Sequence, residues 1–143
     1  MLVKQVTNEK EYSDAVEVRR KVFIEEQRVP EELELDEFED SAVHFVAYED
    51  GVPVGAGRFR QVDRCGKVER ICVLASHRKK GFGEAVMKAI ETYASAERLD
   101  GLKLNAQTQA ASFYERLGYV KTSDEVFLDA GIPHLAMKKL LSP

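Results

Sequence analysis

The chain has 143 residues, of which 44% are hydrophobic and 32% are charged, and its formal net charge is −4. This size and composition predict one globular domain over residues 1–143 and exclude a disordered chain or a fibrous repeat. The negative charge argues against a nucleic-acid partner, and the lack of any apolar run near ~20 residues argues against a membrane partner.

The N-terminal residues Met1 to Lys4 lack the charged and then apolar layout of a secretion signal. The two cysteines, Cys65 and Cys72, form neither a C-x-x-C metal pair nor a disulfide framework. We therefore expect a cytoplasmic protein with reduced thiols and no bound metal.

The first elements along the chain are a strand and a helix. Leu2 to Val6 predicts a short strand, and Asn8 with Glu11 predicts the cap of a helix. Apolar residues then recur at helical spacing, and the helix is expected to end by Glu26, before the extended backbone that Val29-Pro30 favours.

Three strands are expected next. Ala42 to Glu49 has apolar side chains on both faces, and Val52 to Arg60 returns after a turn at Asp50-Gly51. Lys67 to Val73 predicts the third strand of this run.

The C-terminal half alternates helices with strands. A helix is expected from Gly83 onward, then a strand over 101–106, and then a helix from Ala111 to Leu117 that ends at Gly118. This order predicts an α+β fold with a mixed, mostly antiparallel sheet flanked by helices. The helix expected from Gly83 onward connects strands 67–73 and 102–106, and this crossover should place the two strands parallel and side by side.

Acidic residues occupy seven of the ten positions from Glu31 to Asp40. Two interpretations are open, a solvated loop and a lip that attracts a cationic substrate.

The segment from Val73 to Gly83 (V-L-A-S-H-R-K-K-G-F-G) lies between a predicted strand and a predicted helix. Its glycines and the helix start would present free N–H groups to a pyrophosphate, with Arg78 beside them. The segment does not match a P-loop, and Val86 stands where a dinucleotide fingerprint needs its third glycine. A loop that merely starts a helix is the alternative.

This segment resembles the R-x-x-G-x-G acyl-CoA signature of the GNAT N-acetyltransferase superfamily. Ala111 to Tyr119 (A-S-F-Y-E-R-L-G-Y) resembles the second hallmark of that family. R-x-x-V-F-x-x-E-Q from Arg19 to Gln27, and Gly131 to His134, resemble the small bacterial ElaA-like group.

The resemblance implies acetyl-CoA as the acetyl donor, with its pantetheine arm between two splayed parallel strands. It also implies that the Val73 N–H stabilises the oxyanion and that Asn105 contacts the cofactor across the split between the strands. For Asn105, a plain strand-end cap is the alternative. The residues that it assigns to the cofactor are Ile71, Cys72, Val73, Arg78, Lys79, Lys80, Gly81, Phe82, Gly83, Asn105 and Tyr114.

The implied reaction moves the acetyl group to a primary amine by direct attack through a tetrahedral intermediate. The attacking amine must be neutral, so a base is needed. Glu69 is the first candidate, with a salt-bridged strand glutamate as the alternative. Strand alternation would place it on the face of Ile71 and Val73. Glu34, Asp36 and His134 are the further candidates; imidazole titrates near neutral pH.

The resemblance assigns Tyr114 as the proton donor to the departing thiolate, with a core aromatic as the alternative. Cys72 would give a covalent acyl-enzyme, but alternation would place it opposite Glu69, and no histidine adjoins it. His44 is expected to pack in the core.

Two other classes of function stay open besides an enzyme. One is a non-catalytic module that binds or senses acyl-CoA, and the other is a domain that binds ATP or NAD. For an enzyme we expect a cationic small-molecule or peptide amine as acceptor. The sequence is compatible with a homodimer.

Overall fold

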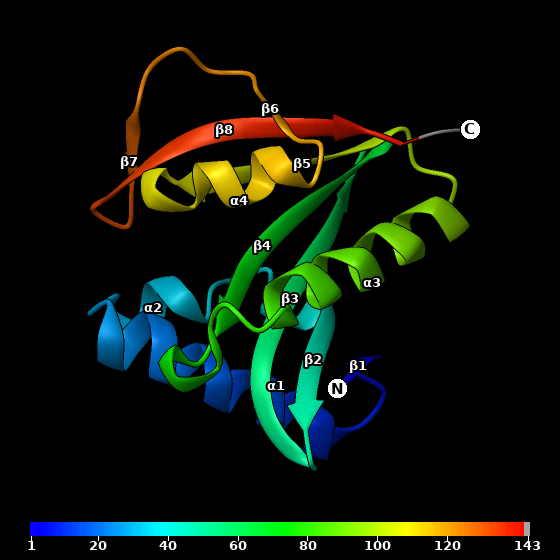
Figure 1. Ribbon diagram of the computed structural model, residues 1–143, viewed down its shortest axis with the longest axis vertical. Helices are drawn as coiled ribbons and strands as arrows, with labels where there is room; N and C mark the ends of the chain where they lie inside the picture. Colours follow the sequence, from blue (N-terminus) through cyan, green and yellow to red (C-terminus); the bar gives the residue numbers. More distant parts are fainter. Residues whose placement is uncertain (142–143) are drawn as a thin grey trace.

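The computed structural model describes residues 1–141, which form an eight-stranded sheet with helices on both faces (Figure 1). The strand order is β1-β2-β3-β4-β5-β8-β6, and β7 pairs with β8. The strands are β1 (Leu2–Gln5), β2 (Val43–Glu49), β3 (Val52–Val62), β4 (Cys65–Val73), β5 (Gly101–Gln107), β6 (Val120–Lys121), β7 (Phe127–Asp129) and β8 (Ile132–Leu140). The helices are α1 (Glu9–Arg19), η1 (Arg20–Glu26), α2 (Glu31–Glu34), η2 (Glu39–Ser41), η3 (Ala75–His77), α3 (Phe82–Ala96), η4 (Thr108–Ala110) and α4 (Ala111–Arg116).

The expected mixed, mostly antiparallel sheet is confirmed. The first helix starts as the sequence predicts, because the Asn8 side chain accepts a hydrogen bond from the Glu11 N–H at 2.8 Å. It then changes character, since η1 is a π-helix, and it ends with the Gln27 N–H bonded to the Val22 carbonyl. Within residues 1–141, no helix is long and apolar enough to cross a membrane.

The two faces of the sheet carry separate clusters of buried side chains. On one face, α3 packs Val86, Met87 and Ile90 against the strands, and α4 joins the same cluster. On the other face, α1 and η1 cover a smaller cluster that includes Val18 and Cys72. These are called the α3 face and the α1 face below.

The parallel strands β4 and β5 are paired only where they begin. Their register runs from Cys65 opposite Gly101 to Val68 opposite Leu104 and stops there. Figure 1 shows the two strands starting together and then diverging. Glu69–Val73 and 105–107 are therefore not paired with each other, and we call this unpaired stretch the strand gap.

A β-bulge lies in β4 at the start of the strand gap. Arg58 is opposite Glu69 and Ala56 is opposite Cys72, so Gly57 faces both Arg70 and the residue after it. Arg70 takes a φ of 59°, which marks the inserted residue.

The bulge overturns the expectation from simple alternation. Because one residue is inserted, Glu69 and Cys72 both point to the α1 face, while Ile71 and Val73 pack with the α3 cluster. Glu69 therefore lies on the other face of β4 from Ile71 and Val73, so the expectation that these three residues share a face was wrong. The expectation that Cys72 and Glu69 lie on different faces was also wrong.

Candidate active site

The edge of β4 presents free backbone groups to the strand gap. The Leu74 N–H donates to the Val54 carbonyl in β3 at 2.9 Å. Because backbone groups alternate in direction along a strand, the N–H groups of Val73 and Ile71 point the other way, toward the strand gap. An amide-rich chain lying there would find these N–H donors free, whereas the Val73 carbonyl already accepts from Arg78 Nε.

A loop with two left-handed residues leads from β4 into α3. Lys79 has a φ of 64° and Gly81 a φ of 89°, a conformation that glycine adopts without strain. No side chain caps α3 at Gly81, so the first N–H groups of this 15-residue helix stay available to an anion. A side chain at Gly83 would meet the Phe113 ring, since its Cβ would lie 3.2 Å from the ring. These features fit a bound pyrophosphate.

The three basic side chains of this loop differ in their surroundings. Arg78 donates to both carboxylate oxygens of Glu26 at 2.8 and 2.6 Å, and its Nε donates to the Val73 carbonyl at 3.0 Å. Lys79 and Lys80 are exposed. Neither lysine forms an ion pair within residues 1–141, so their ammonium groups are the unpaired charges of this loop.

Tyr114 lies on α4, which is on the α3 face. Its side chain is buried, and its ring packs edge-on against Phe113 and Tyr119. Burial raises the pKa of the Tyr114 phenol above its ordinary value, so the hydroxyl keeps its proton at neutral pH.

Glu69 is held by two arginines on the α1 face. Its Oε1 accepts from Arg58 Nη2 at 2.9 Å and from Arg60 Nε at 2.8 Å. Burial alone would raise the pKa of Glu69, but the arginines outweigh burial and lower it below the ordinary value. Glu69 therefore makes the ion pairs that the alternative interpretation expects, and its carboxylate is ionised at neutral pH, the form that a general base requires.

Cys72 is buried under α1. Burial raises the pKa of its thiol to about 12, so almost none is thiolate at neutral pH. A covalent role for Cys72 is thus disfavoured by its surroundings rather than by its face.

The acidic segment 31–40 contributes to a buried network of ion pairs. Arg19 binds Glu34 at 2.7 Å and Glu39 at 2.6 Å, and Arg58 binds Asp36 at 2.7 Å and Glu39 at 2.9 Å. Glu34 is only 1% exposed, so it cannot contact an acceptor.

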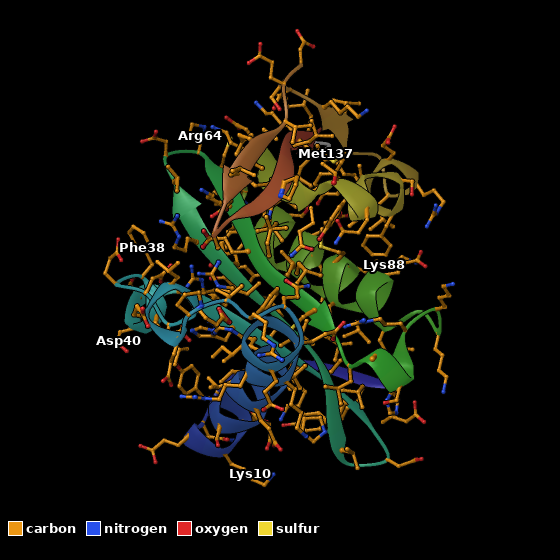
Figure 2. The ribbon with its side chains drawn as sticks, turned by 90° about the vertical axis from the view of Figure 1, so that its left-hand side faces the viewer. Lys10, Phe38, Asp40, Arg64, Lys88 and Met137 are labelled. Atoms are coloured by element: carbon orange, nitrogen blue, oxygen red, sulfur yellow. The ribbon has the colours of Figure 1, made fainter. Side chains whose placement is uncertain are left out.

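Neither interpretation of the acidic run fits these three carboxylates, because arginines inside the protein neutralise them. The remaining acidic residues are exposed, and Figure 2 shows Asp40 at the outer edge of the molecule with Phe38 above it. The exposed acidic residues of the segment are Glu31, Glu32, Glu37 and Asp40. The expected packing of His44 is confirmed, since its Nε2 lies 3.0 Å from the Glu39 carbonyl.

His134 and Asn105 lie across the strand gap from Glu69. In the register of β5 and β8, Leu104 opposite Met137 packs in the α3 cluster, so Asn105 and His134 point to the α1 face. Asn105 is exposed at the first position after the β4–β5 pairing ends. His134 stacks on Phe127, and its Nδ1 donates to the Ile132 carbonyl at 2.6 Å, which leaves Nε2 as the acceptor in the neutral ring.

Several residues around the site receive no role from the sequence. Glu26 and Gln27 belong to the ElaA-like motif without being assigned to the site, and the residues not singled out at all are Arg58, Arg60, Arg70 and Gln107. A usable signal exists for Arg58, because a charged residue inside the apolar strand G-A-G-R-F-R must have a buried partner.

Comparison with known proteins assigns the fold. The sequence model of the acetyltransferase (GNAT) domain matches residues 5–141. The uncharacterized N-acetyltransferase YjcF of Bacillus subtilis is 53% identical over 132 residues, which cover 92% of this chain and 94% of that protein.

Solved structures agree. Escherichia coli ElaA aligns with a TM-score of 0.82 at 19% identity, over 96% of this chain and 99% of ElaA. An aminoglycoside 6′-N-acetyltransferase complexed with coenzyme A aligns with a TM-score of 0.79 at 17% identity, over 100% and 98% of the two chains. At these sequence identities the two structures support the assignment of the fold alone.

Proposed function

Since the chain belongs to the GNAT acetyltransferase family, we propose that it is an N-acetyltransferase that moves acetyl from acetyl-CoA to a primary amine. The observation that carries the proposal is the strand gap. At this unpaired stretch an ionised carboxylate lies on one face of the sheet, and a protonated phenol lies on the other face. The donor would enter from the α3 face and the amine from the α1 face.

The donor would be held mainly by backbone groups. The loop before α3 and the start of that helix suit the pyrophosphate, and the free edge of β4 suits the amides of the pantetheine arm. The CoA bound to the structurally similar aminoglycoside enzyme supports this choice of donor. The residues proposed to form the site are Ile71, Cys72, Val73, Arg78, Lys79, Lys80, Gly81, Phe82, Gly83, Asn105 and Tyr114.

The chemistry would divide between the two faces. On the α1 face, Glu69 takes the proton of the amine, directly or through water, and the amine attacks the thioester carbonyl directly. The N–H of Val73 points into the strand gap and would stabilise the oxyanion of the tetrahedral intermediate. On the α3 face, Tyr114 protonates the departing CoA thiolate.

The proposed acceptor is a small molecule or peptide that presents a protonated primary amine. The exposed carboxylates of Glu32 and Glu37 form no ion pair within residues 1–141 and would attract such a cation, whereas Glu31 is paired with Arg20. The buried carboxylates of the same segment make no such contribution, since arginines already neutralise them.

A binding and turnover experiment tests the proposal. Acetyl-CoA at 100 times its Kd should stabilise the fold by about 2.7 kcal/mol, which a thermal shift detects. A panel of polyamine, amino sugar, lysine peptide and peptide N-terminus should then include an amine that releases free CoA. Binding without turnover of any amine would favour a sensing module, and a shift produced by ATP or NAD but not by acetyl-CoA would contradict the proposal.

Replacing Tyr114 by phenylalanine separates chemistry from binding. The ring and its packing stay, so the Kd of acetyl-CoA should change little, while kcat should fall ~10- to 100-fold. The loss should be below the usual range for a general acid, because a thiol with a pKa of about 8.5 leaves readily without help. Steady-state kinetics and calorimetry measure the two quantities. An unchanged kcat would remove Tyr114 from the mechanism.

A further inference from the structure

The signature arginine of the loop before α3 is already occupied. Arg78 makes a bidentate ion pair with Glu26 at 2.8 and 2.6 Å, and its remaining Nε holds the Val73 carbonyl at 3.0 Å. All three nitrogens of the guanidinium are thus engaged, and its charge is balanced by one carboxylate. Such a group adds little attraction for a phosphate, because its field is cancelled at close range.

The end of the first helix also reaches the other strand of the gap. The residue after Glu26 is Gln27, whose side-chain carbonyl accepts from Gln107 Nε2 at 2.9 Å at the end of β5. Two consecutive residues therefore join η1 to both diverging strands. The π-helical turn supports this placement, since the Gln27 N–H bonds to Val22 five residues back.

We propose that Glu26 and Arg78 act as positioning residues for the edge of β4, and that Arg78 is not the counter-charge of the pyrophosphate. Glu26 fixes the guanidinium, and the guanidinium holds the Val73–Leu74 peptide unit through its carbonyl. This keeps the end of β4 in place, where the neighbouring N–H of Val73 faces the strand gap. Gln27 and Gln107 hold the opposite strand. The inference rests on the proposed function, because it concerns how the pantetheine arm is received.

The positive charge that attracts the phosphates of the cofactor then comes from the exposed lysines of the loop, Lys79 and Lys80. Lys80 is exposed and forms no ion pair within residues 1–141, so its ammonium is free to approach an anion. Lys80 is thus a matched control for Arg78: both are cations of the same loop, and only Arg78 holds the β4 backbone.

Two ligands distinguish the roles. Coenzyme A carries the phosphates and the pantetheine arm, whereas pantetheine carries the arm alone. We would measure the Kd of each by NMR titration, which reads millimolar affinities, for the parent chain, Arg78→Gln, Glu26→Gln and Lys80→Gln. The Kd of coenzyme A would also be measured over a range of salt concentrations, because salt screens contacts with phosphate. Melting temperatures check that each variant is folded, and both pair members are exposed enough to tolerate change.

Arg78→Gln should weaken pantetheine about tenfold, because the uncharged arm reports only on how the edge of β4 is held. It should weaken coenzyme A by at least that factor, because the Glu26 carboxylate is then left without its partner beside the phosphates. Glu26→Gln should also weaken pantetheine about tenfold, because the guanidinium is no longer fixed. Lys80→Gln should weaken coenzyme A alone and flatten its salt dependence. A loss confined to coenzyme A in Arg78→Gln, or unchanged pantetheine binding in Glu26→Gln, would overturn the inference, as would a parent chain that does not bind pantetheine. If the parent chain bound neither ligand, the proposed function itself would fall.

Discussion

Replacing Glu69 by glutamine is expected to lower kcat/KM at neutral pH by about 100-fold, the lower end of the range of general base catalysis, because the arginines that lower its pKa also make it a weaker base. A primary amine with a pKa of about 10.4 is almost wholly protonated at pH 7, so it needs a group that removes its proton. Glu69 is ionised throughout the neutral range, because its arginine partners lower its pKa below the ordinary value. The amide keeps the shape of the carboxylate and its place beside Arg58, but it cannot accept the proton.

The pH profile gives the prediction its sharper form. With Glu69 present, kcat/KM should be nearly flat between about pH 6 and 9, since the carboxylate does not titrate there. In Glu69→Gln, the rate should rise about tenfold per pH unit as the amine loses its proton unaided. The matched variant is His134→Gln on the other side of the strand gap. If that variant alone changed the profile, His134 would be the base instead.

The sequence could predict the local features of the fold, because helix caps and glycine turns depend on a few neighbouring residues. The helix cap at Asn8 and the glycines of the loop before α3 depend on a few neighbouring residues, and the structure has them where the pattern indicates. The parallel neighbours β4 and β5 follow from the handedness of crossovers. Such features need no knowledge of distant contacts.

The face of Glu69 could not be predicted, because one inserted residue reverses the alternation. The bulge at Arg70 is set by the pairing of β3 with β4, in which Arg58 and Glu69 attract each other. In the strand pattern alone, V-E-R-I-C-V reads as regular. β8 could not be predicted for a different reason, because Pro133 and the two lysines near the end of the segment are untypical of a strand. In the structure, β5 pairs with β8 along the whole length of β5.

The acidic run was misread because composition does not reveal partners. Seven acidic residues in ten indicate a solvated surface, yet three of them meet arginines contributed by α1, β3 and β4. An arginine such as Arg19 inside an amphipathic helix looks like a surface residue until its neighbours are known. Long-range charge pairing of this kind is visible only in the fold.

Replacing Arg58 by alanine is expected to cost about 3–5 kcal/mol of unfolding free energy, the usual cost of removing one partner from a buried ion pair. Arg58 is 0% exposed, and it donates to Asp36, Glu39 and Glu69. Without it, these carboxylates would repel one another where water is scarce. The control is Arg64→Ala. Arg64 also makes a bidentate pair, with Asp100 at 2.9 and 3.1 Å, but on the exposed surface, so its loss should change the melting temperature little. Equal effects of the two substitutions would contradict the buried role.

The acid limb of stability shows whether the network acts through its carboxylates. Burial alone would raise the pKa of Glu39, but hydrogen bonds from Arg19 and Tyr12, with Arg58 behind them, hold it at about 2. A carboxyl whose pKa is lowered on folding stabilises the fold above its unfolded value and loses that contribution as the pH falls toward the folded one. The melting temperature of the parent chain should therefore fall between about pH 4.5 and 2. In Arg58→Ala the pKa of Asp36, which Arg58 chiefly lowers, should move back toward its ordinary value, and the pKa of Glu39 should follow in part, so that the same interval carries a smaller fall. An equally steep acid limb in both chains would mean that Arg58 contributes packing rather than charge.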